Sequence, residues 1–227
     1  MMTFLKLTLP GLLLFMSCLS RSAESISAET IINNSIRFHD PENNWNSFQG
    51  KFLFDSRFHF ADSNQESIVV TVDVEKNYLK YHNLFRKVDL DFFSDTCILN
   101  SSNGSCDGYR WTKNFYTFIW GLPMKLKDPG ISPISKYTVD TFNHKTCYNV
   151  AVHYEAENFQ FYFDTTNYQM MGFSFSKNDK SSKGEIIYLD RLIQFQGIKF
   201  PKKKTYWVLP DTIFGGTNEA LSIMEVD

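Results

Sequence analysis

The sequence lacks an excess of charge of either sign. Its 227 residues hold 23 Lys and Arg against 25 Asp and Glu, for a net charge of −2. A nucleic-acid-binding protein needs a basic face to neutralise phosphates, so we expect neither DNA nor RNA as a partner. The length fits one domain of ordinary size or two small ones, and a chain of this length can bury a core without further cross-links.

The sequence also lacks the short motifs of the common catalytic folds. It contains no P-loop, GxGxxG, HExxH or GxSxG. Strands do not alternate with helices, which argues against a parallel nucleotide-binding sheet. The histidines, at positions 39, 59, 82, 144 and 153, show no spacing typical of a zinc site. We therefore expect no metal and no cofactor, and the sequence favours a non-enzymatic role.

Long hydrophobic runs are missing after the N-terminus. The run LTLPGLLLFM follows one lysine and is too short to span a bilayer, which is typical of a signal peptide. Leu14 to Cys18 resembles a bacterial lipobox, in which the cysteine is lipidated, although Phe15 and Met16 depart from its preferred residues. Ordinary signal-peptidase cleavage is the alternative, but Arg21 two residues before Ala23 fits its pattern poorly.

These features predict three segments. Residues 1–18 form a signal peptide of the lipoprotein type, residues 19–25 a short tether, and residues 26–227 a single domain. An acylated Cys18 would anchor the protein to a membrane, because each buried CH₂ group contributes ~0.8 kcal/mol. The expected location is outside the cytoplasm, in the cell envelope.

Cysteine is scarce, with 4 residues in all. Cys97 and Cys106 bracket a polar loop, and disulfides persist in exported proteins. We expect these two to pair, and a bridge over so short a loop would contribute ~2–3 kcal/mol. Cys147 is then left as a small apolar residue of a strand. A nucleophilic role is the alternative, with His144 or His153 nearby in the sequence.

Aromatic residues are abundant, with 22 Phe, 11 Tyr and 4 Trp. In residues 51–58 the even positions Phe52, Phe54 and Phe58 are aromatic, whereas the odd positions Lys51, Asp55 and Arg57 are polar. Such period-two patterns predict strands with one face buried. They recur along the chain and indicate about ten strands of antiparallel sheet. The aromatic face either lines an apolar ligand cavity or forms an ordinary core.

Two helices are predicted. The first covers residues 26–38, with Ser27 as its cap and Asp40-Pro41 as its end. The second covers residues 111–120 and ends at Gly121. Residues 84–93 fit either a strand or a helical turn. The fold class is therefore mainly β, with an N-terminal and a mid-chain helix.

Four sequence stretches carry a resemblance to known proteins. They are His39-Asp40-Pro41 followed by Trp45, GLPMKLKDPG at 121–130, YFD at 162–164, and GIKFPKKKTYW at 197–207. Together they resemble an uncharacterised family of Bacteroidota exported proteins and lipoproteins, over roughly residues 26–215. More remotely, the order of elements is similar to that of the periplasmic lipoprotein carriers LolA and LolB.

The remote resemblance implies a particular architecture and function. LolA-like proteins place an N-terminal helix over a strongly curved antiparallel sheet, an unclosed barrel with a helical plug, whose cavity holds acyl chains. It implies an exported protein of a Gram-negative cell envelope that binds a lipid or another hydrophobic molecule. The arginine with which those carriers latch their lid has no matching position here.

The stretch 121–130 is predicted to form a flap over the mouth of the cavity. Pro123 fixes the backbone and Pro129-Gly130 forms a tight turn. The expected flap presents Leu122, Met124 and Leu126 to the cavity at alternating positions. Its rim would carry Lys125, Lys127 and Asp128. The alternative is a loop that only covers a strand edge.

Three polar groups are weighed as candidates. His39 and Asp40 form either an acid–base pair or the structural end of a helix. Asp190 and Arg191 interrupt an apolar strand and would pair inside or at the rim of a cavity. The run 202–204, three lysines, is expected to protect an edge strand or to cover a solvated face.

The sequence thus leads to a hydrophobic-ligand carrier as the first hypothesis, with a hydrolase using His39 and Asp40 and a structural module without a ligand as alternatives. The partners expected for the first are a lipid, and a membrane through Cys18, and the protein is expected to be a monomer. The residues predicted to line the cavity are Trp45, Phe54, Phe58, Phe118, Trp120, Leu122, Met124, Leu126, Phe161, Phe173 and Trp207.

Overall fold

One antiparallel sheet dominates the protein. A computed structural model describes residues 26–59, 65–107, 110–154, 157–177 and 183–226. In these residues 12 strands follow the order β5-β4-β3-β2-β1-β12-β11-β10-β9-β8-β7-β6. The strands are β1 (Gln49–Phe58), β2 (Gln65–Asp73), β3 (Tyr78–Asn83), β4 (Val88–Phe93), β5 (Thr96–Leu99), β6 (Ser132–Phe142), β7 (Lys145–Tyr154), β8 (Glu157–Asp164), β9 (Met170–Lys177), β10 (Gly184–Phe195), β11 (Ile198–Leu209) and β12 (Ile213–Met224).

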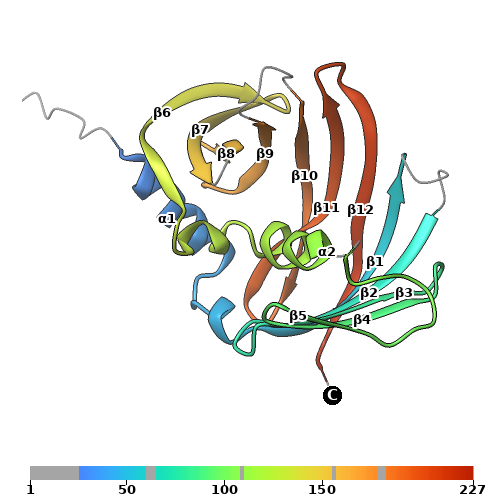
Figure 1. Ribbon diagram of the computed structural model, residues 1–227. Helices are drawn as coiled ribbons and strands as arrows, with labels where there is room; N and C mark the ends of the chain where they lie inside the picture. Colours follow the sequence, from blue (N-terminus) through green and yellow to red (C-terminus); the bar gives the residue numbers. More distant parts are fainter. Residues whose placement is uncertain (1–25, 60–64, 108–109, 155–156, 178–182, 227) are drawn as a thin grey trace, which may run out of the picture.

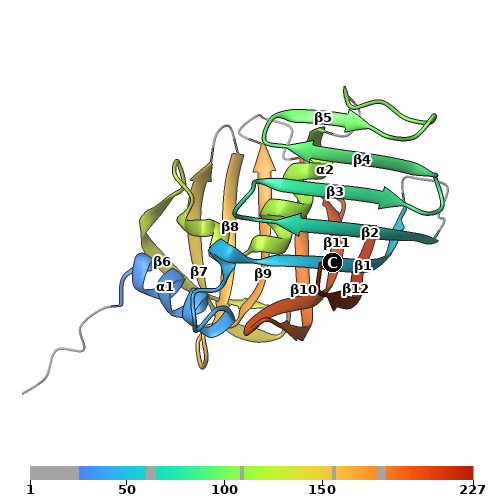
Figure 2. The same ribbon diagram turned by 90° about the horizontal axis from the view of Figure 1, so that it is seen from below.

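The path of the chain forces one segment to cross the open side of this sheet. β1 pairs with β12, so the first and last strands meet in its middle. The two edges are β5 and β6, which are consecutive in the chain. The segment between them contains α2 (Arg110–Asn114), the π-helix η3 (Phe115–Ile119) and the 3₁₀-helix η4 (Met124–Lys127). Figures 1 and 2 show this segment inside the curve of the sheet.

The sheet is strongly curved and remains unclosed, as expected (Figure 1). Its register shifts between Leu53 and Phe54 and between Tyr206 and Trp207, and such bulges increase the local twist. At Gly216 the φ angle is +141°, and a Cβ would lie 2.1 Å from the carbonyl oxygen of Arg57. Only glycine therefore fits where β12 passes β1 at this point.

Helix α1 (Ala28–His39) confirms the prediction for the N-terminal region. The Ser27 hydroxyl accepts a hydrogen bond from the Thr30 amide at 3.0 Å, as expected of a helix cap. Ile31 and Ile32 are buried, and the helix packs against β6 and β11. Two short turns of chain after α1 lead through η1 (Trp45–Ser47) into β1.

Most strands follow their period-two patterns. The described residues form 12 strands where about ten were expected, and the short β5 includes Cys97, the first of the two cysteines that bracket the loop. Residues 88–93 form a strand. β11 begins at Ile198, before Pro201; over residues 198–201 it pairs with β10, and its pairing with β12 begins at Lys203.

The cysteines behave as expected. Cys97 and Cys106 form a disulfide that ties the end of the sheet to the loop leading into α2. Cys147 is free and buried, and burial raises the pKa of its thiol to about 11. A thiol with so high a pKa is a poor nucleophile, so the small apolar residue is the better interpretation of Cys147.

The core consists of two large apolar clusters on the inner side of the sheet. The first cluster is built mainly from β1 to β4, together with Ile198, Phe200 and Ala220 of β11 and β12. The second cluster is built mainly from α1 and β7 to β10, together with Tyr206 of β11. The segment between β5 and β6 contributes to both clusters, so the position of this segment determines how the interior is filled.

Candidate functional site

The inner face of the sheet is covered by residues 115–127, which we call the plug. The plug comprises η3, the turn at Gly121 and η4. Tyr116, Trp120 and Met124, spaced four residues apart, pack into the first cluster. Leu122 and Leu126 pack into the second. All five side chains are buried, so the plug fills the concave side with its own apolar groups.

The predicted flap has the right residues inside but the wrong backbone. Residues 124–127 form a 3₁₀-helix instead of an extended, alternating strand. The amide of Leu126 donates to the carbonyl of Pro123 at 2.9 Å, and that of Asp128 to the carbonyl of Lys125 at 3.1 Å. Proline is well tolerated at the start of such a turn because it needs no donor there. Lys125 and Asp128 form an ion pair on its outer side.

The other residues expected to line a cavity fall into two groups. Phe54 lies under Trp120 with ring centres 4.5 Å apart, Trp45 stacks on Phe48, and Phe54 and Trp45 are buried in the first cluster. The residues of the second cluster or packed against it are Phe161, Phe173, Phe58 and Phe118. Phe118 is part of the plug, and the others share the inner face with it.

Trp207 lies on the opposite face of the sheet, so its predicted place in the cavity was wrong. It is partly exposed and contacts Phe214, a surface residue, with ring centres 5.6 Å apart. β11 is regular here, since Tyr206 and Trp207 pair with Ile187 and Ile186 of β10. Successive residues of a strand point to opposite faces, so the inward Tyr206 places Trp207 outside. The sequence shows this alternation but not which face of β11 is the inner one.

His39 is a structural link and not an acid–base group. It is fully buried; its Nδ1 lies 2.6 Å from the carbonyl of Lys199, and its Nε2 accepts from the amide of Met170 at 3.1 Å. The first contact makes Nδ1 the protonated nitrogen, since a carbonyl only accepts. Burial lowers the pKa of His39 to about 4, so the ring is neutral near pH 7.

Asp40 is equally occupied. Its two carboxylate oxygens accept from the backbone amides of Asn44 and Trp45 at 2.8 and 2.9 Å. The group thus shapes the turn after α1 and places Trp45 against the first cluster. Because the hydrogen bonds of both side chains hold the backbone, the interpretation of His39 and Asp40 as a hydrolytic pair loses its support.

Asp190 and Arg191 pair with each other at 3.4 Å as expected, but on the surface, so a place inside a cavity was wrong. Their side chains are 65% and 49% exposed, and Arg191 also pairs with Glu219 at 3.0 Å. Arg191 has a φ angle of +55°, which turns the strand locally and directs the pair outward. The two charges therefore stay hydrated and need no buried partner.

The lysine run contains the site residue that sequence reasoning missed. Lys204 is fully buried, and its Nζ lies 3.0 Å from the centre of the Trp120 ring. The protection of an edge strand was therefore the wrong interpretation for Lys204, since β11 is an inner strand. Its two-residue spacing from the aromatic Tyr206 was the available signal, because i and i+2 share a face.

Lys204 belongs to a line of polar residues across three neighbouring strands. Ser56 on β1 is the register partner of Asn218 on β12, and Asn218 is that of Lys204 on β11. We call these three the polar row; all are fully buried. The Asn218 amide donates to the Ser56 hydroxyl at 2.5 Å. A buried polar row in an apolar interior needs a reason, because desolvation of such groups is costly.

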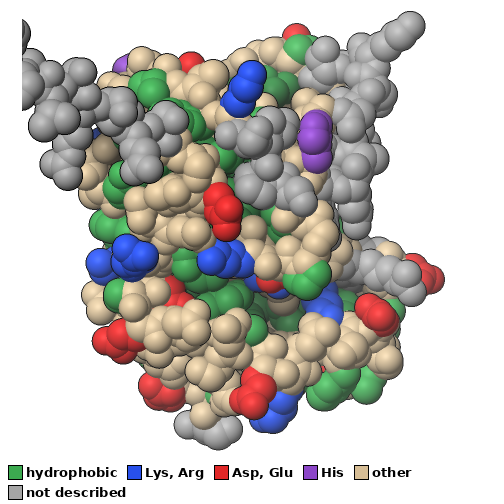
Figure 3. Space-filling view, turned by 90° about the vertical axis from the view of Figure 1, so that its left-hand side faces the viewer, with side chains coloured by type: hydrophobic (Ala, Val, Ile, Leu, Met, Phe, Trp, Pro, Cys, Tyr) green, Lys and Arg blue, Asp and Glu red, His purple; other side chains and the backbone are tan. Residues whose placement is uncertain are grey.

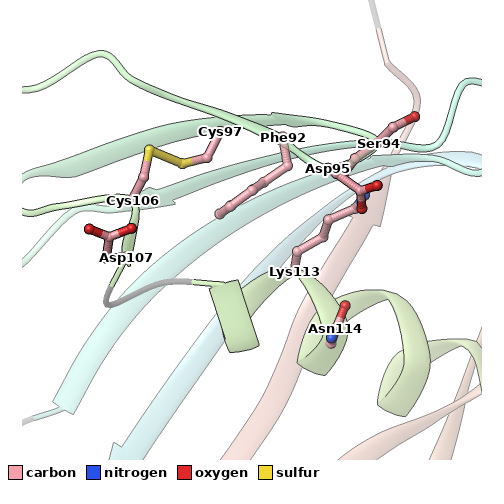
Figure 4. A pocket seen from close by; sticks show the side chains of 8 residues that line it. All are labelled: Phe92, Ser94, Asp95, Cys97, Cys106, Asp107, Lys113 and Asn114. Carbon is pink, nitrogen blue, oxygen red and sulfur yellow. A yellow bond between two sulfur atoms is a disulfide. The ribbon is translucent and has the colours of Figure 1, made fainter.

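A cavity of about 400 Å³ opens where the chain enters the plug. It is lined by Phe92, Ser94, Asp95, Cys97, Cys106, Asp107, Lys113 and Asn114. In Figure 4, Lys113 reaches from α2 toward Ser94 and Asp95, and its ammonium donates to the carbonyl of Ser94. Burial lowers the pKa of Lys113.

Figure 3, from another side, shows a hollow with hydrophobic side chains at its bottom and charged ones around it.

Solved structures share this architecture. A LolA superfamily protein from Nitrosomonas europaea has a TM-score of 0.57 and 9% identity, covering 89% of this chain and 95% of its own. A proposed outer membrane lipoprotein-sorting protein domain from Vibrio parahaemolyticus has a TM-score of 0.55 and 8% identity, covering 86% and 90%. The fold is LolA-like.

Comparisons by sequence add no further relative. No family model matches the chain, and no curated protein does. Among the described residues, no helix is long and apolar enough to cross a membrane. The same part of the chain contains no group of three or more His, Cys, Asp or Glu placed to hold a metal ion.

Proposed function

We propose that this protein is an exported carrier that holds a hydrophobic ligand, a lipid or an acyl chain, between the curved sheet and the plug. The observation that carries the proposal is the cover of the inner face. A short segment of helical turns covers the aromatic face of the sheet, where a sandwich would have a second sheet. Such a segment can move away from the sheet without separating any pair of strands.

The hydrogen bonds of the plug support this movement. The backbone hydrogen bonds that the structure describes for residues 122–131 join residues of this segment to one another. Packing of apolar side chains, together with side-chain hydrogen bonds of Tyr116 to Asn218 and Ser56, holds the segment on the sheet. An acyl chain would offer the sheet the apolar part of this contact. The π-helix η3 also supports a functional role for the plug. π-helical turns are rare in proteins overall, and those that occur often lie at functional sites.

The proposal includes the location of the protein. The apolar run before Cys18 favours export and acylation at this cysteine, which lies outside the described residues. One structure with the same fold is named for outer membrane lipoprotein sorting, which supports a place in the envelope of a Gram-negative bacterium. The resemblance of residues 121–130 to Bacteroidota proteins is part of the same proposal, as is a monomeric state.

Native mass spectrometry combined with a fluorescent probe tests the carrier function. We expect the purified protein to retain lipid mass in the spectrometer. After delipidation it should bind 1-N-phenylnaphthylamine saturably, with one site per chain, and acyl compounds should displace the probe. The same spectra should show acylation at Cys18. A protein that carries no lipid and gives no saturable probe signal would instead have a permanently filled core.

A further inference from the structure

The side chain of Lys204 places an amine in the centre of the interior. Its Nζ is buried and has no hydrogen-bond partner among the described residues. The buried carboxylates among the described residues have other partners. Asp40 accepts hydrogen bonds from the amides of Asn44 and Trp45. The other three form ion pairs: Glu66 with Arg86, Asp73 with Lys76, and Asp164 with Lys145. The part of the chain that the structure describes therefore provides no counter-ion to an amine that would need one to stay charged.

The neighbours of Lys204 add further hydrogen-bond donors. Trp120 Nε1 and the Tyr206 hydroxyl are also buried without a partner among the residues that the structure describes. Trp120 covers the Lys204 amine, and Tyr206 lies two residues along β11 on the same inner face. An ammonium, an indole N–H and a phenol all donate. Such a set suits an oxygen-rich anion better than a neutral apolar group.

The position of the polar row fits the head of an extended molecule. On one side of Lys204 along β11 is Phe200 of the first cluster, and on the other is Tyr206 of the second. The row therefore lies where the two apolar halves of the interior meet. A charged head bound there would leave an apolar tail free to follow either cluster. One lysine matches a single negative charge, so a carboxylate fits better than a phosphate.

We propose that the polar row binds the carboxylate of a long-chain fatty acid, with Lys204 as its counter-ion. This inference rests on the proposed carrier function, because Trp120 must move with the plug before the carboxylate can reach the amine. In the closed state, burial lowers the pKa of Lys204 well below its usual value. The Trp120 ring is then the neighbour of the amine, with Nζ 3.0 Å from the ring centre.

Competition binding with paired ligands tests the inference. Hexadecanoic acid and hexadecan-1-ol have the same chain and differ in the charge of the head. We expect the acid to displace 1-N-phenylnaphthylamine at a concentration at least ten times lower than the alcohol does. Lys204→Met and Lys204→Gln should both reduce this ratio to about one while the alcohol still binds. Two variants are used because each changes the packing of the plug in its own way, and the ratio between ligands is insensitive to that change.

Lys203→Met is the matched control, since Lys203 is the adjacent lysine of the same strand and is not fully buried. It should keep the preference of the wild type for the acid. Equal affinity of the wild-type protein for acid and alcohol would overturn the inference and leave the carrier function standing. So would a preference that survives in both Lys204 variants. A wild-type protein that binds neither ligand would overturn both.

Discussion

At the scale of single residues, burial determines what the polar groups do. In the sequence, His39 and Asp40 mark the end of a helix. In the structure, their side chains form hydrogen bonds with backbone groups. Lys204 is one of three lysines in the sequence run and the only one of the run that is fully buried. The chemistry of each residue therefore follows from its place in the sheet more than from its immediate neighbours in the chain.

His39 should make the stability of the protein depend on pH. Its pKa is about 4 in the folded protein, against 6.5 for an unperturbed histidine, so the unfolded chain binds more protons between these values. Stability is then complete above pH 6.5 and is lost as pH falls toward 4. We expect His39 to account for about 2 kcal/mol of loss between about pH 7.5 and about pH 5.

Denaturant unfolding at both pH values measures this effect. The variant His39→Gln should be less stable at about pH 7.5 and should lose about 2 kcal/mol less than the wild type on acidification. His144→Gln, at an exposed position, serves as the control and should follow the wild type. An equal loss in His39→Gln and the wild type would show that His39 does not titrate as its burial requires.

At the scale of elements, the plug is both a cover and a competitor of the ligand. Its five buried side chains contact the surface that an acyl chain would use. A ligand must therefore overcome the packing of the plug, and its apparent affinity depends on how often the plug is open. This relation predicts that weaker packing of the plug gives tighter binding.

The substitution Leu126→Ala tests the competition. Leu126 is 3% exposed in the second cluster, and loss of its side chain should destabilise the closed state by about 2–5 kcal/mol. Since about 1.4 kcal/mol corresponds to a factor of ten, we expect the dissociation constant of hexadecan-1-ol to fall at least tenfold. Leu221→Ala, at a position 51% exposed, should leave it unchanged. Weaker binding by Leu126→Ala would mean that Leu126 contacts the bound ligand.

At the scale of the whole molecule, the sequence predicted the fold class well and the interior only in part. Period-two patterns such as that of Phe52 and Phe54 identify strands and their buried faces because the pleat imposes that period. The disulfide between Cys97 and Cys106 agrees with the prediction from their spacing and from the export that the N-terminal run indicates. The LolA-like architecture also agrees with the resemblance in element order.

What the sequence could not provide is the order of strands and the consequences of that order. The inner place of β11, which buries Lys204, depends on its pairing with β10 and β12. The outward position of Trp207 depends on which face of β11 is turned inward, and the shape of the plug on one short 3₁₀ turn. Long-range pairing decides each of these, and local patterns do not encode it.

The central claim is that the plug leaves the inner face when a ligand binds. Hydrogen–deuterium exchange of the purified protein, with and without hexadecan-1-ol, measures this movement directly. The account predicts that amides of residues 115–127 exchange at least ten times faster in the complex, while those of β1, β11 and β12 keep their protection. A saturating ligand that leaves the exchange of the plug unchanged would contradict it.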